Sequence, residues 1–181
     1  MSTDKIISLD SLGNGIPVIP EEAAAFYKQN CMVCFNICGH KSGVILVTVY
    51  DDQNLKIEIC WNGQVTDELR RAYRDLQKAT EFASCALALL LVRELTDYVT
   101  IEQSVRGTTI DYYLVPKDQD PHFFFNYAAR LEVSGILREN SKNSLEKRIA
   151  QKVKRLRKEE GLEDLIIVVE FSQPWSKIVT I

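Results

Sequence analysis

The stretch from Phe82 to Val92 is almost entirely apolar and lies in the second half of a long predicted helix. Thr66 can accept a hydrogen bond from the first amide groups of this helix, which is expected to run from about Asp67 to Tyr98. A helix that is apolar on nearly every side must be covered by other elements on most of its surface. We therefore expect a compact globular protein with this helix in its interior.

Upstream of the helix, three segments have the β-branched or alternating composition of strands. They are Val33–Cys38, Val44–Tyr50 and Leu55–Trp61, separated by short turns. An irregular arm and a short helix over Glu21–Gln29 come before them. We expect residues 1–66 to form an arm and an antiparallel β-meander that packs on the rest of the protein.

Downstream of the helix, the predicted order is strand, strand, strand, helix, strand. The strands are Val99–Val105, Thr109–Val115, Tyr127–Ile136 and Leu165–Phe171. The apolar seam of the intervening helix consists of Leu145, Ile149, Val153 and Leu156. Residues 67–181 are thus expected to form an α/β core with a mixed sheet, in the element order αβββαβ, followed by a C-terminal tail.

The charge of the chain limits how it could bind nucleic acid. A formal net charge of −3 argues against a protein that coats nucleic acid through an overall basic surface. Residues 142–160, however, hold eight lysines and arginines against three glutamates. This segment is the predicted contact with nucleic acid, through the backbone because it lacks aromatic residues for stacking. The alternative is a solvated helix face, the commoner role of a basic amphipathic helix.

Composition also predicts the compartment. The N-terminal residues 1–5 lack the charged and apolar regions of a signal peptide, and the longest nearly apolar stretch is too short to cross a bilayer. Five cysteines, an odd number, fit a reducing environment with free thiols. We expect a cytoplasmic protein without membrane contact.

One group of residues has a spacing near that of zinc ligands: Cys31, Cys34, Cys38 and His40. The last three fall in an alternating strand pattern without a knuckle turn, and no second ligand pair follows downstream. The pattern is therefore weak for a tetrahedral zinc site.

Two acidic residues stand among large apolar neighbours in the predicted strands. Asp111 lies in the second strand after the long helix, and Glu132 lies in the third. A carboxylate in such a setting costs free energy unless it is paired, hydrogen-bonded or bound to a cation. Converging carboxylates would suit Mg²⁺ or Mn²⁺, which can polarise a phosphodiester and lower the pKa of a bound water. The alternative is a solvated sheet face on which the acids pair with Arg130 or Arg106.

The order αβββαβ, with Asp111 on the second strand and Glu132-Val133-Ser134 on the third, resembles the PD-(D/E)XK superfamily of restriction-endonuclease-like phosphodiesterases. In that family an acid on the second strand and the acid of an E-x-K triplet bind a divalent ion, and the lysine assists the attacking water. A glutamate on the preceding helix often joins them. The resemblance, which covers residues 67–171, implies that Asp111 and Glu132 are metal ligands and that Glu81 is a third.

The sequence departs from this family at Ser134, which stands where the family has its lysine. A hydroxyl group cannot place a positive charge beside an attacking hydroxide, so another residue must do so. Lys152 on the following helix is the expected substitute, and Lys142 is the second choice. Segments 79–82, 107–114 and 129–135 also resemble those of a group of uncharacterised bacterial proteins, which carries no assigned activity.

The sequence therefore predicts a nuclease-like, Mg²⁺- or Mn²⁺-dependent phosphodiesterase, with Asp111, Glu132, Ser134 and Lys152 at its catalytic site. One alternative is a catalytically inactive protein of the same fold that binds nucleic acid or protein. Another is a small inhibitor or partner protein unrelated to nucleases. Convergence of the Asp111 and Glu132 carboxylates, with a lysine ammonium beside them, would favour the enzyme.

The C-terminal segment predicts self-association. Residues 171–181 carry Trp175 and several aliphatic residues beyond the last core strand, and Pro174 blocks a simple continuation of that strand. The αβββαβ unit offers this tail no further position, so we expect it to form the interface of a homodimer. The alternative is a tail that packs on the meander of its own chain.

Overall fold

The computed structural model describes residues 3–119, 126–156 and 161–181, and within them eight strands form one mixed sheet. The strands are β1 (Lys5–Ser8), β2 (Val44–Tyr50), β3 (Gln53–Cys60), β4 (Tyr98–Gln103), β5 (Tyr112–Pro116), β6 (Ala129–Ile136), β7 (Glu163–Glu170) and β8 (Trp175–Thr180). The helices are α1 (Glu21–Ile37), α2 (Asp67–Ala72), α3 (Leu76–Leu95) and α4 (Leu145–Arg155), with a 3₁₀ turn at Leu9–Ser11. The α/β class with a mixed sheet is as predicted.

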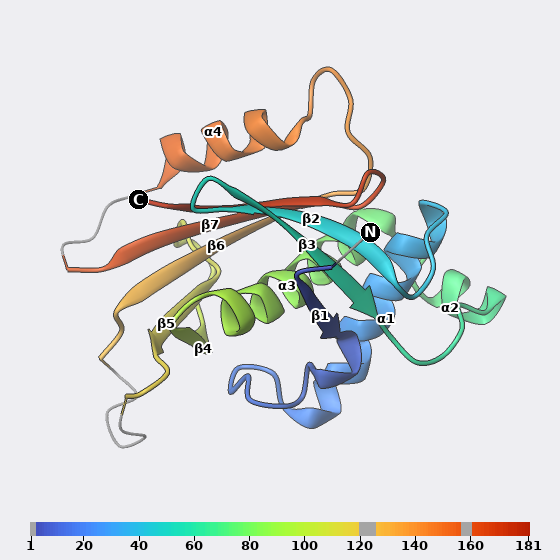
Figure 1. The fold of residues 1–181 in the computed structure, drawn as a ribbon, viewed down its shortest axis with the longest axis horizontal. Coiled ribbons are helices and arrows are strands. Elements are labelled where there is room, and N and C mark those ends of the chain that lie inside the picture. The colour runs from blue at the N-terminus through green and yellow to red at the C-terminus, as the bar shows by residue number, and fades with distance from the viewer. Residues whose placement is uncertain (1–2, 120–125, 157–160) are drawn as a thin grey trace.

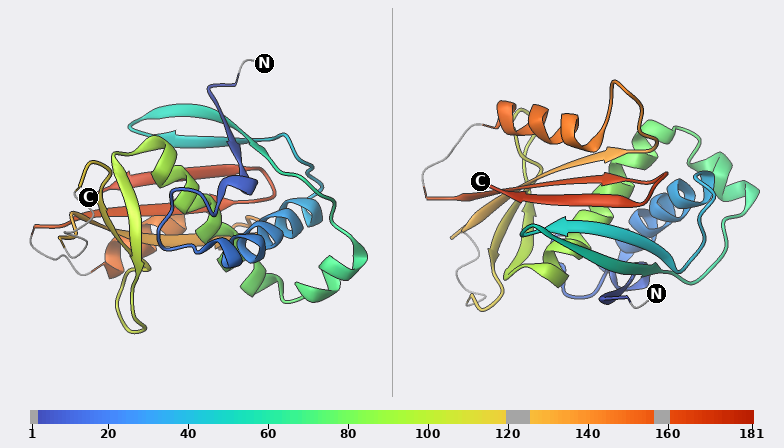
Figure 2. Two further views of the ribbon diagram at one scale, coloured as in Figure 1. Left: turned by 90° about the horizontal axis from the view of Figure 1, so that it is seen from below. Right: turned by 45° about the horizontal axis from the view of Figure 1, so that its top comes forward.

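The sheet has the spatial order β1-β3-β2-β8-β7-β6-β5-β4. Strands β4, β5 and β6 are antiparallel neighbours, and α4 then connects β6 to its parallel neighbour β7. Helices α1 and α3 pack on one face of the sheet, and α4 lies alone on the other face (Figure 1). In the left view of Figure 2, α1 and α3 lie in front of the strands and α4 lies behind them.

Helix α3 occupies the centre of the larger core, as its apolar composition predicts. Its residues from Ala86 to Val92 are all buried, because the sheet covers one side and α1 covers another. It approaches β6 closely at Gly135, where an added Cβ would lie 2.8 Å from Ser84 Oγ and from the carbonyl oxygen of Thr80. A side chain at position 135 would therefore push α3 away from β6.

The predicted strand Val33–Cys38 is wrong, because these residues continue α1 to Ile37. The buried side chains of Cys31, Cys34 and Phe35 have the spacing of one helix face. The residues between them are also buried, so apolar periodicity cannot separate a strand from a helix here. Extending a helix that has already begun upstream avoids a second costly nucleation. The N-terminal antiparallel unit is the β2–β3 hairpin, with β1 added in parallel to β3.

The predicted helix from Asp67 to Tyr98 is two helices. Thr66 caps the first, as expected, by accepting a hydrogen bond from Leu69 N. Asp75 caps the second by accepting one from Lys78 N, so the chain turns between them. The second helix ends at Leu95, and Tyr98 already belongs to β4.

The C-terminal tail has a position in the sheet that the αβββαβ order did not reveal. A turn containing Pro174 reverses the chain after β7, and β8 then pairs antiparallel with β7 and parallel with β2. The strand therefore joins the N-terminal hairpin to the core in one sheet. Because the tail has a place in the sheet of its own chain, it no longer supports a dimer interface. The homodimer remains a prediction.

No helix in the described part of the chain is long and apolar enough to cross a membrane.

Candidate functional site at the open edge of β6

Strand β6 loses its β5 neighbour halfway along its length. The backbone N–H of Asp111 donates to Leu131 O at 2.8 Å, and the N–H of Val133, two residues further along β6, donates to the Asp111 carboxylate at 2.7 Å. The side chain of Asp111 thus takes the place of a strand carbonyl. From Ser134 onward, none of the described strands lies on this side of β6.

The segment before Asp111 explains why β5 begins later than predicted. Gly107 has a φ of 103°, in the left-handed region, and it turns the chain after β4. The Thr108 hydroxyl then donates to Val105 O at 3.0 Å, so a side chain satisfies a carbonyl within the turn. Regular pairing starts at Tyr112, and Asp111 lies at the point where β5 diverges from β6.

Asp111 and Glu132 come together at this point. Tyr112 pairs with Leu131 in the antiparallel register, which places Asp111 opposite Glu132. Burial raises the pKa of Glu132, and the negative charge of Asp111 raises it further, against the lowering effect of Lys152, to about 7. The two carboxyl groups therefore repel each other when both are ionised, and they hydrogen-bond when Glu132 is protonated.

Lys152 reaches this pair of acids from α4. Its ammonium group donates a hydrogen bond to Glu132 Oε1, and the two side chains are 22% and 10% exposed. The contact joins α4 to β6 at the edge of a second, smaller apolar core between α4 and the sheet. In this core Leu145 and Ile149 pack on Ile166. The cation at this site thus comes from the helix and not from the position of Ser134.

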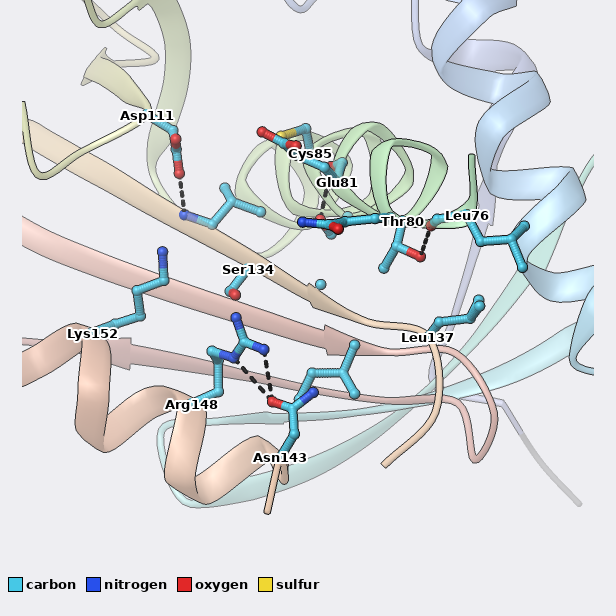
Figure 3. Close-up of a pocket in the computed structure, with 15 residues that line it drawn as sticks. Leu76, Thr80, Glu81, Cys85, Asp111, Ser134, Leu137, Asn143, Arg148 and Lys152 are labelled. Carbon is cyan, nitrogen blue, oxygen red and sulfur yellow. Dashed lines mark hydrogen bonds between the residues drawn. The ribbon is translucent and has the colours of Figure 1, made fainter. Parts of the chain in front are cut away.

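A cavity of about 460 Å³ lies beside these residues, between α3, the open edge of β6 and α4. Asp111 and Glu81 border it on the side of α3, while Lys152 and Arg148 border it from α4 (Figure 3). The side chain of Ser134 points toward Arg148 on the α4 side. The cavity is thus lined by charges of both signs.

Glu81 is exposed on α3 and does not complete a cluster of three ligands. Among residues 3–119, 126–156 and 161–181, no three His, Cys, Asp or Glu side chains are arranged to hold a metal ion. Two carboxylates, Asp111 and Glu132, form the acidic part of the site. The group Cys31, Cys34, Cys38 and His40 is likewise not arranged as a metal site among the described residues. The Cys31 thiol donates to Ala83 O, and the His40 ring lies 3.0 Å from Ser172 O.

Cys85 lies on α3 at the wall of the cavity, near the acidic residues. Burial, together with the charges of Asp111, Glu81 and Glu132, raises the pKa of its thiol to about 12, although a hydrogen bond with Tyr112 lowers it. The thiol is therefore protonated at neutral pH and is not a nucleophile there.

The basic helix presents its cations in two directions. Lys147, Lys154 and Arg155 are exposed, whereas Arg148 and Lys152, one turn apart, face the cavity. The predicted seam holds for Leu145 and Ile149 but not for Val153, which is 41% exposed. Residues 157–160 of the predicted basic segment lie outside the described part of the chain.

Sequence reasoning missed three residues of the site: Asn143, Arg148 and Cys85. The Asn143 amide oxygen accepts hydrogen bonds from Arg148 Nε at 3.2 Å and Nη2 at 2.7 Å. The spacing of Arg148 and Lys152, four residues apart on one helix, was a usable signal for a shared face. No pattern in the sequence pointed to Cys85, because its position depends on how α3 packs against β5.

Comparisons with models of protein families, with curated proteins and with solved structures give no match to this chain.

Proposed function

We propose that this protein is a divalent-metal-dependent phosphodiesterase that acts on nucleic acid, built on a restriction-endonuclease-like core. The observation that carries the proposal is the meeting of Asp111, Glu132 and Lys152 beside a cavity. Two carboxylates and an ammonium group from three separate elements supply ligands for a cation and a positive charge for a reacting phosphate.

The arrangement of elements supports the proposed fold. Helix α3, strands β4 to β6, helix α4 and strand β7 follow one another in the order αβββαβ. The positions of the acids support the proposed family pattern, with Asp111 directly before the second strand and Glu132 within the third. The site opens at the edge where these two strands separate.

The donor set fits Mg²⁺ or Mn²⁺, because such ions commonly use one or two protein carboxylates and take their remaining ligands from water and substrate phosphates. Asp111 and Glu132 would hold the ion. When bound, it would polarise a phosphodiester and lower the pKa of a bound water. A cation would also relieve the repulsion between the two carboxylates, which is the main charge effect that raises the pKa of Glu132.

Lys152 takes the role that Ser134 cannot fill. Its ammonium group stands at Glu132, so it can stabilise negative charge that develops on a phosphate bound at the same place. The Ser134 hydroxyl lies on the same strand, two residues further on, and can orient a water molecule by hydrogen bonding.

A second candidate is a catalytically inactive protein of the same fold that binds nucleic acid or protein. One observation favours it: both carboxylates already have partners within the chain. Asp111 accepts Val133 N–H, and Glu132 accepts from Lys152. In this role the acids would close the open end of the strand pair and position α4.

The test combines Mn²⁺ and Mg²⁺ titration calorimetry with cleavage assays on single- and double-stranded DNA and RNA. The wild type is expected to bind Mn²⁺ and cleave. Glu132→Gln and Asp111→Asn, which keep the shape of each side chain, should lose metal affinity by about tenfold or more and lose cleavage. Glu146→Gln removes an exposed acid from α4 and is the matched control, with no change expected.

The outcomes separate the two candidates. Binding of nucleic acid without cleavage, unaffected by Glu132→Gln, would favour the inactive binding protein. Cleavage that survives Glu132→Gln would contradict the proposed site.

A further inference from the structure

Arg148 is a cation at the cavity with no carboxylate partner among the described residues. Its hydrogen-bond partner is neutral: Nε and Nη2 both donate to the amide oxygen of Asn143. The other cavity cation, Lys152, is instead paired with Glu132. A half-buried guanidinium held by a neutral acceptor keeps its full charge available for an anion.

The loop before α4 is built to hold Asn143 in place. Asn140 Oδ1 accepts hydrogen bonds from Lys142 N at 2.9 Å and from Asn143 N at 3.0 Å, and the backbones of Asn140 and Asn143 bond to each other in both directions. Ser144 then caps the helix. Arg148, one turn into α4, therefore has a fixed acceptor, which orients its guanidinium group before any ligand arrives.

This orientation leaves the third guanidinium nitrogen, Nη1, pointing toward Ser134 and into the cavity (Figure 3). A backbone donor lies at the same edge. The N–H groups of alternate strand residues point to the same side, so Gly135 N–H points to the side on which Val133 N–H meets Asp111. That side is the open edge of β6, which borders the cavity.

We propose that Arg148, oriented by Asn143, binds a phosphate group in this cavity, and that this group belongs to a nucleic acid strand. The planar fork of arginine matches two oxygens of a phosphate, and the uncompensated charge favours an anion over a neutral ligand. The assignment to a strand rests on the proposed function. Arg148 and Lys152 lie one helical turn apart. Arg148 would therefore hold a phosphate next to the one that reacts near Lys152 and Glu132.

The proposal is tested without metal, in EDTA, so that cleavage plays no part. The Nε–H resonance of Arg148 is followed by NMR on protein labelled with ¹⁵N-arginine, and Arg148→Gln identifies it. Inorganic phosphate, a thymidine dinucleotide and the same dinucleotide with a 5′-phosphate are the probes. Saturable shifts are expected with phosphate and with both dinucleotides, because a bridging phosphodiester also presents two oxygens.

Asn143→Asp is the decisive variant. It keeps the size of the side chain but gives Arg148 a carboxylate partner, so the protein should fold as well as the wild type and bind the probes at least about tenfold more weakly. Lys154→Gln removes an exposed charge from the same helix and is the control, with little change expected. Equal phosphate affinity in Asn143→Asp and wild type would overturn the proposal, as would an equal loss in Lys154→Gln.

The remaining outcomes separate this inference from the proposed function. Binding of inorganic phosphate without binding of either dinucleotide would overturn the assignment to a strand. Probe binding that depends on Arg148, in a protein that neither binds Mn²⁺ nor cleaves, is a further outcome. That result would support the phosphate site and contradict the proposed phosphodiesterase activity.

Discussion

Two ion pairs lie on the same face of β6, two residues apart, and they are built differently. Arg130 pairs with Asp164 on the neighbouring strand, through Nε at 2.8 Å and Nη2 at 3.0 Å. These two residues are also register partners in the parallel β6–β7 ladder. Glu132 pairs with Lys152, which comes from a helix across the smaller core. One pair is set by the sheet, and the other depends on how a separate element docks.

The difference separates a pair whose charges are matched in place from a pair that has a repelling charge beside it. The Arg130–Asp164 pair is 5% and 4% exposed, and its bidentate geometry satisfies both charges in place. Glu132 has a single ammonium partner and a second carboxylate, Asp111, beside it, so its pKa is raised to about 7. Burial with a repelling neighbour makes a further cation favourable beside Glu132, whereas the two charges of the first pair already match each other.

The largest expected effect tests the Arg130–Asp164 pair. Arg130→Ala leaves the Asp164 carboxylate buried without this cation, which should lower the free energy of unfolding by about 3 to 5 kcal/mol. Lys152→Ala should cost less, because Glu132, whose pKa is raised to about 7, can take up a proton when it loses its partner. Urea denaturation of both variants measures the difference, and similar losses would show that the two pairs are equivalent.

The next effect tests the Glu132–Lys152 pair. Lys152→Ala should lower cleavage about 100-fold, because the developing negative charge loses its cation. The same change should strengthen Mn²⁺ binding, since an ammonium group no longer competes for Glu132. Calorimetry and cleavage rates are measured on one preparation, with exposed Lys147→Ala as the control. Weaker metal binding in Lys152→Ala would contradict competition at Glu132.

The smallest effect is a pH dependence of stability. The pKa of Glu132 lies above its ordinary value of 4.5, so the folded state binds more protons than the unfolded state between about pH 4.5 and 7. Its contribution therefore makes the protein less stable as the pH rises through this window, by about 1 to 3 kcal/mol. Urea denaturation at several pH values should show this slope in the wild type and a flatter one in Glu132→Gln. Identical slopes in the two proteins would show that a group other than Glu132 takes up the proton.

Much of the core was predictable because its signals are local. The strands that became β2, β3, β4 and β7 were recognised from their apolar composition, and the cap at Thr66 from its side chain. The acids were found because a carboxylate among apolar residues requires a partner. The predicted strand at Val33–Cys38 failed because a segment buried on all sides has no informative period.

The sequence by itself determined the element order from α3 to β7 and the candidate acids, since each follows from residue type and spacing along the chain. Only the tertiary structure decided that Lys152 reaches Glu132, that Asn143 orients Arg148, and that β8 completes the sheet between β2 and β7. These contacts join residues from separate elements, and the docking of α4 and the pairing of edge strands depend on the packing of the whole chain.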